Sequence, residues 1–167
     1  MELNPYAKFL GSAEPLPVLT NTVEHLRTLT APLSADQINQ QPAPGKWSIR
    51  EIVCHLADCE TVFSFRLRQT LAEDHHIIQP FDQERWAKRY AAYTLPAALT
   101  LFEAARNWNL KLLTTIKEED RSRPVSHPER GTMTFWTIVE TMAGHDINHL
   151  KQVEHLAGKQ TNLAASK

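Results

Sequence analysis

Four stretches of the chain repeat apolar residues at helical spacing, and prolines or polar residues separate them. They cover about residues 18–30, 49–72, 94–116 and 134–158. An apolar stripe with a period of 3.6 residues must be buried against another element, so four of them predict helices around one core. Glycine is scarce, at 5 in 167 residues, which suits long helices better than a fold rich in tight turns. We therefore predict an all-α four-helix bundle.

Two of these helices have clear start signals. The segment Ser48-Ile49-Arg50-Glu51 fits the capping box, in which a serine caps the helix and a glutamate three residues later bonds back to the serine amide. Thr94 can cap the third helix, with Pro96 in its first turn. We place the start of the last helix near Thr134 or Phe135 and its end at Gly158.

The connections between the helices differ in length. Residues 73–93 read as a loop that includes a short helix near Gln83 to Tyr90, and residues 33–40 can add one short turn. Residues 118–132 are polar and contain Pro124, Pro128 and Gly131, which predicts a loop. Residues 1–16 are expected to have little regular structure. The extra short helices and long loops leave one domain, residues 1–167, with its core at about 16–158.

Composition excludes several classes of protein. The formal net charge is −1 and the pI is about 6.7, so no basic excess favours nucleic acid as a partner. No apolar run approaches the ~20 residues of a membrane span. Cys54 and Cys59 lie five apart on one helix and cannot bridge each other. With no signal-like N-terminus, we expect a soluble protein in a reducing cytoplasm.

His145 and His149 lie four apart in the last helix, so they differ in direction by about 40° and share one face. The same stripe contains Met142 and Ile138 and is otherwise apolar, which places both imidazoles toward the core. Alone, such a pair favours two hydrogen-bonded core histidines over a metal site. A buried histidine pair needs one or the other.

His55 shifts the balance toward a metal. It lies near the apolar seam of the helix that the capping box starts. Three histidines on two core-facing helices fit one divalent ion better than three independent coincidences. Three histidines with an open position are a catalytic arrangement for zinc. Imidazole also suits nickel, iron and copper, so the ligands do not fix the metal. Among divalent ions we expect zinc or nickel, with iron and manganese as alternatives.

Two neighbours of these histidines have competing interpretations. The zinc-protease motif HExxH needs a glutamate after its first histidine, whereas this chain has Asp146. We therefore set the protease aside and expect Asp146 to orient an imidazole or to face solvent. Cys59, one turn after His55, could be a fourth ligand, but a small buried hydrophobic residue is the simpler interpretation.

Taken together, these motifs resemble the DinB-like, or YfiT-like, superfamily of metal-dependent hydrolases and thiol transferases. The resemblance covers roughly residues 16–157. It rests on Lys46-Trp47-Ser48-Ile49-Arg50-Glu51, His55-Leu56-Ala57-Asp58-Cys59-Glu60, Arg66, Phe81-Asp82-Gln83, Trp86, Arg106, His127-Pro128-Glu129-Arg130-Gly131, and His145-Asp146-Ile147-Asn148-His149 with Gln152. It implies a bundle with the unusual order up-down-down-up, metal ligands at His55, His145 and His149, and a homodimer.

Such a site would activate water or a low-molecular-weight thiol to attack an electrophilic small molecule. Three acidic residues are candidates for proton transfer or for orienting the ligands: Asp58, Asp82 and Asp146. Four residues are candidates for substrate binding: Arg66, Trp86, Arg106 and His127. Each has a simpler interpretation as an ion pair, a core residue or a loop residue.

Two other functions fit the same residues. One is a non-catalytic, dimeric, stress-related protein in which the metal is a structural staple. A closed shell of four protein ligands would favour it, whereas three ligands and a water would favour catalysis. The other is an interaction module whose pocket binds a small molecule without metal.

Overall fold

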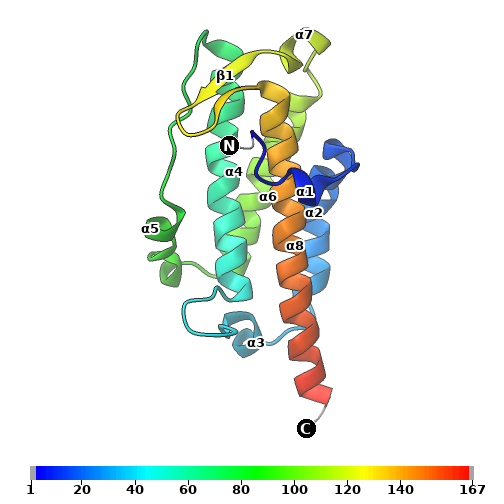
Figure 1. Ribbon diagram of the computed structural model, residues 1–167. Helices are drawn as coiled ribbons and strands as arrows, with labels where there is room; N and C mark the ends of the chain where they lie inside the picture. Colours follow the sequence, from blue (N-terminus) through cyan, green and yellow to red (C-terminus); the bar gives the residue numbers. More distant parts are fainter. Residues whose placement is uncertain (1–2, 166–167) are drawn as a thin grey trace.

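The computed structural model describes the backbone of residues 3–165 and the side chains of residues 3–158. Four long helices make up the bundle: α2 (Pro15–Thr30), α4 (Ile49–Ala72), α6 (Leu95–Leu113) and α8 (Phe135–Ala165). They pack side by side along most of their length (Figure 1). The predicted all-α four-helix bundle is confirmed.

Contacts between the helices define their directions. Thr22 of α2 donates to Asp146 of α8. His25, later in α2, lies opposite Glu154, later in α8, so α2 and α8 are parallel. Arg106 of α6 donates to the Leu19 carbonyl near the start of α2, whereas Arg27 near the end of α2 pairs with Glu103, which comes earlier in α6, so these two helices are antiparallel. The resulting order is the up-down-down-up arrangement that the resemblance implied.

A long crossover allows α6 to run parallel to α4. From the end of α4 the chain returns along the outside of the bundle through α5 (Gln83–Ala87) and the 3₁₀ helix η1 (Tyr90–Ala92) (Figure 1). Arg50, in the first turn of α4, donates to the carbonyl oxygens of Tyr90 and Tyr93. This contact fixes the start of α6 beside the start of α4.

Side-chain caps begin the helices as the sequence predicts. Ser48 Oγ accepts from the Glu51 amide at 3.3 Å, and a Glu51 carboxylate oxygen accepts from the Ser48 amide at 2.8 Å. Thr94 caps α6 through the Ala97 amide. The short turn predicted at residues 33–40 is α3 (Ala35–Asn39), which has its own capping box.

The region predicted as a polar loop is partly regular. It contains α7 (Glu118–Arg121) and a hairpin of β1 (Pro124–His127) and β2 (Gly131–Thr134), antiparallel and in the register Val125 to Met133. Both of these residues are buried, so the hairpin has an inward face. Strands of only four residues show too short an alternation to be recognised in the sequence. Gly131, at φ +89°, provides the backbone conformation after the turn.

The N-terminal region is also more regular than predicted. Residues 7–10 form α1 (Ala7–Leu10), and α2 begins at Pro15, three residues before the predicted start. Proline suits the first turn of a helix because its missing amide donor has no partner there in any case. α1 lies across α8 near the middle of the bundle (Figure 1).

Gly158 does not end the last helix, which continues to Ala165. The backbone of Gly158 is helical. The predicted helix end at Gly158 is therefore wrong, since residues 159–165 are helical, while positions 166–167 lie outside the described residues.

Buried polar residues divide the core into two apolar clusters. One cluster packs around Leu26, Ile52 and Phe102, and the other around Leu67, Phe135 and Met142. Between them lies a layer of buried polar side chains: Thr22, His55, Glu60, Arg106, Asn109, His145, Asp146 and His149. None of the described helices is long and apolar enough to cross a membrane.

Candidate metal centre

Three imidazole rings meet inside the polar layer. The Nε2 atoms of His55 and His145 are 3.0 Å apart. The ring of His149 lies 4.8 Å from that of His55 and 4.4 Å from that of His145, between centroids. Exposed fractions of 1%, 4% and 5% place all three in the interior. The two helices thus bring together the three histidines singled out in the sequence.

The protonation of these rings suits a cation. Burial, and then the field of His149, lower the pKa of His55 to about 3. Burial lowers the pKa of His149 to about 4 and also puts the pKa of His145 well below its ordinary value. All three rings are therefore neutral near pH 7, which is the form that binds a metal.

The nitrogen geometry also fits. At the usual Zn–N distance of about 2.0–2.1 Å, two nitrogens on one tetrahedral ion lie about 3.3 Å apart. The observed Nε2–Nε2 separation of 3.0 Å is close to that value. The Gln152 amide oxygen lies 3.0 Å from His149 Nδ1 and can only accept, so Nδ1 donates and Nε2 keeps its lone pair for a ligand.

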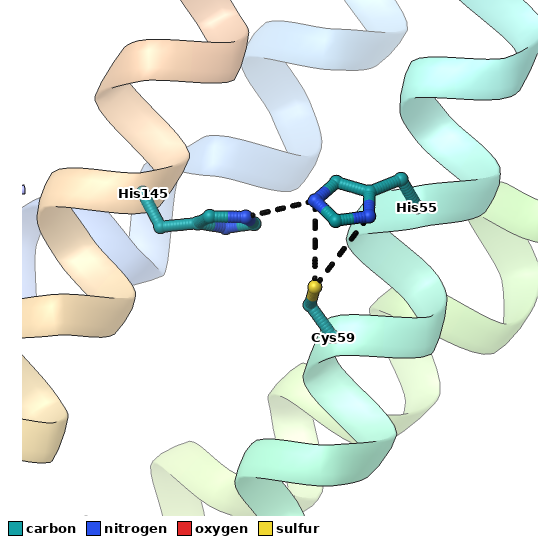
Figure 2. A group of neighbouring side chains, drawn as sticks. All are labelled: His55, Cys59 and His145. Atoms are coloured by element: carbon teal, nitrogen blue, oxygen red, sulfur yellow. Dashed lines mark hydrogen bonds between the residues drawn. The ribbon is translucent and has the colours of Figure 1, made fainter. Parts of the chain in front are cut away.

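Cys59 belongs to the same group. Its Sγ lies 3.5 Å from His55 Nε2, and Figure 2 shows the thiol and both rings facing a common space between α4 and α8. One donor atom each from His55, Cys59 and His145 lies within 4.8 Å of the other two. Burial, followed by the field of Asp58, raises the pKa of the Cys59 thiol. The sequence had favoured a purely apolar role for this residue.

Aromatic side chains surround the three histidines. The Tyr6 ring lies nearly perpendicular to that of His145 with centroids 5.0 Å apart, and the Trp47 ring lies 4.7 Å from that of His55. Tyr6 comes from the N-terminal region and Trp47 from the position before the Ser48 cap. Neither residue was predicted from the sequence to belong to the site.

A cleft of about 470 Å³ opens beside the histidines. His55 and His149 form part of its wall, and its other lining residues include Tyr6, Lys46, Trp47, Ile52 and Gln152. A space of this size accommodates a small organic molecule. Two of the three imidazoles therefore border a cleft with both apolar and polar walls.

Asp146 and Arg106 belong to a buried ion network, which corrects both expectations. Arg106 is 1% exposed, and it contacts Asp146 at 2.6 Å and Glu60 at 2.8 Å. Thr22 donates to the same Asp146 oxygen, and Asn109 donates to Glu60. Within residues 3–158, Asp146 therefore neither faces solvent nor bonds to an imidazole, and the buried Arg106 has no face open to a substrate.

The structure places three other candidates away from the histidines. Asp58 lines a separate groove between α4 and α6. Asp82 is the cap of α5, where its Oδ1 accepts from the Arg85 amide at 3.0 Å. Trp86 packs against Phe81 and is 41% exposed. Its neighbours Gln83 and Glu84 line the cleft instead.

Arg66 and His127 lie together, on the hairpin side of the histidines. Both line a second, smaller cavity, which Arg130 also lines. Arg130 was not among the residues predicted from the sequence to bind substrate. The hairpin brings these residues together, and because the sequence did not reveal the hairpin, it could not predict this grouping.

The comparisons with known proteins agree with this architecture. A profile of the DinB superfamily matches residues 19–153, which is most of the chain. The protein therefore belongs to the DinB superfamily.

Two relatives extend the match over most of both chains. One, from Oceanobacillus iheyensis, is 29% identical over 156 residues, which cover 92% of this chain and 86% of the relative. Another, from Geobacillus kaustophilus, is 31% identical over 135 residues, covering 78% and 75%. Both are provisionally named metal-dependent hydrolases.

The fold also matches a solved structure, that of YfiT from Bacillus subtilis. The TM-score is 0.80 at 20% sequence identity, covering 95% of this chain and 89% of YfiT. YfiT is described as having an unusual four-helix bundle topology and, provisionally, as a metal-dependent hydrolase. At this identity the likeness supports the fold.

Proposed function

We propose that this chain is a metal-dependent enzyme that acts on an electrophilic small molecule, as a hydrolase or as an S-transferase that uses a low-molecular-weight thiol. His55, His145 and His149 would hold one divalent ion, with zinc or nickel favoured over iron or manganese. The convergence of three neutral, buried imidazoles beside an open cleft carries the proposal. The provisional names of the relatives support the hydrolase class.

A divalent ion held there supplies a Lewis acid and lowers the pKa of a water or thiol that it binds. The protein's own residues would prepare the site. Gln152 fixes the tautomer of His149, and Tyr6 and Trp47 restrict the motion of the other two rings. The cleft walls exclude part of the water around the reacting groups, which strengthens electrostatic interactions there.

Cys59 favours a second candidate function, a metal-binding protein without catalysis. If its thiol completed a shell with the three histidines, the ion would be a structural staple with no open position. We propose the enzyme first because two of the histidines line a cleft large enough for a substrate. A homodimer in the cytoplasm is part of the proposal in either case.

The test is elemental analysis of protein purified without an affinity tag. We expect about one divalent ion per chain in the wild type and loss of that ion in His149→Ala. His155→Ala is the matched control, because His155 is on the same helix, is exposed and lines the cleft. Full metal occupancy in His149→Ala would contradict the site.

Activity is then screened with a panel of electrophiles, each offered with water alone and with several thiols. Turnover that requires the ion and is lost in His149→Ala would establish an enzyme, and the need for a thiol would separate transfer from hydrolysis. Stoichiometric metal with no turnover, together with a large loss of stability after chelation, would favour the structural alternative.

A further inference from the structure

A second cavity, of about 20 Å³, lies between the hairpin and the helices α4 and α8. Its polar lining comes from Arg66 of α4, His127 and Arg130 of the hairpin, and Thr141 of α8. Its apolar walls are Phe63, Ile78, Met133 and Ile138. So small a volume admits only a single small functional group of a ligand.

The lining contains basic groups and no carboxylate. Arg66 donates from Nη2 to the Gln79 carbonyl at 3.2 Å, but its Nε is buried and has no hydrogen-bond partner within residues 3–158. Across the same residues, neither Arg66 nor Arg130 forms an ion pair with a carboxylate. Guanidinium groups at partly buried positions are normally paired, so this arrangement needs an explanation.

His127 adds a donor to the same cavity. It is buried, and its Nδ1 accepts from the Glu129 amide at 3.2 Å. Burial and the fields of Arg130 and Arg66 lower the pKa of His127, so the ring is neutral near pH 7. A neutral ring that accepts at Nδ1 carries its proton on Nε2 and can donate from there. Two guanidinium groups and one imidazole N–H can thus face a shared acceptor.

The cavity is close to the three histidines. Phe63 forms one of its walls, and the ring centroid of Phe63 lies 6.1 Å from that of His145. Thr141, another lining residue, precedes His145 by one turn of α8. The positive field extends into the site, because Arg66 and Arg130 act electrostatically on Cys59 and Tyr6 respectively.

We propose that this cavity is an anion subsite, in which Arg66, Arg130 and His127 bind one carboxylate group. The planar guanidinium fork matches the two oxygens of a carboxylate, and the space admits little more than that group. Building on the proposed function, the subsite would select substrates or thiols that carry a carboxylate at a fixed distance from the reacting atom. The anion would also offset the repulsion between the two arginines.

The subsite is tested first without metal. Sodium formate is titrated into chelator-treated protein at constant ionic strength, and the side-chain N–H signals of the arginines are followed by NMR. We expect saturable shifts for Arg66 and Arg130 and none with formamide, the neutral counterpart. Arg130→Gln and Arg66→Gln should weaken formate binding about tenfold each.

Arg89→Gln is the matched control, because Arg89 is exposed and lies outside the cavity. Its formate affinity should stay within about twofold of the wild type. Arg130 is in the hairpin turn, so its replacement keeps the test valid if Arg66→Gln fails to fold. Formate affinity that is unchanged in Arg130→Gln overturns the subsite.

Formate binding at the subsite is expected to be independent of the metal. His149→Ala should keep formate binding while losing its ion, so a failed metal site and a failed subsite give different outcomes. In the active enzyme, mercaptoacetate and 2-mercaptoethanol form a matched thiol pair. Arg130→Gln should raise the KM for mercaptoacetate about tenfold and leave that for 2-mercaptoethanol unchanged, whereas an equal rise for both would contradict carboxylate selection.

Discussion

Tyr6 crosses α8 directly over Gly144, the residue before His145. A Cβ atom at position 144 would lie 2.6 Å from the Tyr6 carbonyl oxygen and 2.8 Å from Tyr6 Cβ. Only glycine permits this approach, which holds the Tyr6 ring nearly perpendicular to that of His145. The N-terminal segment is thereby a wall of the candidate metal centre.

Gly144→Ala should displace this wall. The added methyl group collides with backbone atoms of Tyr6, which cannot move aside as a flexible side chain would. We expect α1 to separate from α8, and the amides of Phe9, Leu10 and Gly11, which bond within this segment, to exchange with solvent at least about tenfold faster. Hydrogen exchange measured by mass spectrometry checks this.

Gly158→Ala is the control on the same helix, since a Cβ atom there would meet nothing within 4 Å. It should stabilise the protein by up to about 1 kcal/mol through helix propensity and leave exchange in the N-terminal segment unchanged. Equal exchange in Gly144→Ala and the wild type would mean that the close approach does not hold the segment.

The buried network around Arg106 should contribute strongly to stability. Arg106→Met leaves the carboxylates of Glu60 and Asp146 without their cation in the interior. We expect the free energy of unfolding to fall by about 3–5 kcal/mol in urea titrations. Arg27→Met removes the exposed pair with Glu103 and should cost less than about 1 kcal/mol. Similar losses in the two variants would contradict the structural role of Arg106.

Much of the fold could be predicted because its signals are local. Helical periodicity located the four long helices, and the caps at Ser48 and Thr94 located two of their starts. The hairpin and α1 have no comparable signal. Val125 and Met133 become the inward face only after the two strands pair, and the position of α1 depends on a contact with Gly144, far along the chain.

The candidate site was predictable where it depends on helical spacing. His145 and His149 share a face by geometry, and His55 joined them because its helix also faces the core. Partners that depend on tertiary packing could not be predicted. Adjacent residues on a helix differ by about 100° in direction. Asp146 therefore points toward Arg106 and α2, although it follows His145 directly in the sequence.

Metal-free protein should lose stability in mildly acidic solution. The folded-state pKa values of His55 and His149, about 3 and about 4, lie below the ordinary value of 6.5. Between these limits the unfolded chain binds more protons than the folded one, so the free energy of unfolding falls as pH drops below about 6.5. For His149 the loss reaches roughly 3 kcal/mol near pH 4.

Urea titrations of chelator-treated protein across this range measure the effect. His149→Gln should show a shallower decline than the wild type, because one buried titrating group has gone. His155→Gln, at an exposed position on the same helix, should keep the wild-type slope. Parallel curves for all three proteins would show that the imidazole of His149 is not held neutral by burial.

The role of Cys59 decides between an open and a closed metal shell. Burial and the neighbouring carboxylate of Asp58 disfavour its thiolate, although Sγ lies 3.5 Å from His55 Nε2. We therefore expect the ion to be held by histidines alone. Cobalt-substituted protein should lack the near-ultraviolet charge-transfer band of a thiolate ligand. Cys59→Ala should keep the cobalt spectrum and bind the ion within about threefold of the wild-type affinity.

Cys54→Ala is the matched control, because Cys54 is the other buried thiol on α4 and lies outside the group of donor atoms. A thiolate band that Cys59→Ala abolishes and Cys54→Ala retains would establish a fourth protein ligand, and the structural staple would then replace the enzyme as the better account of this site.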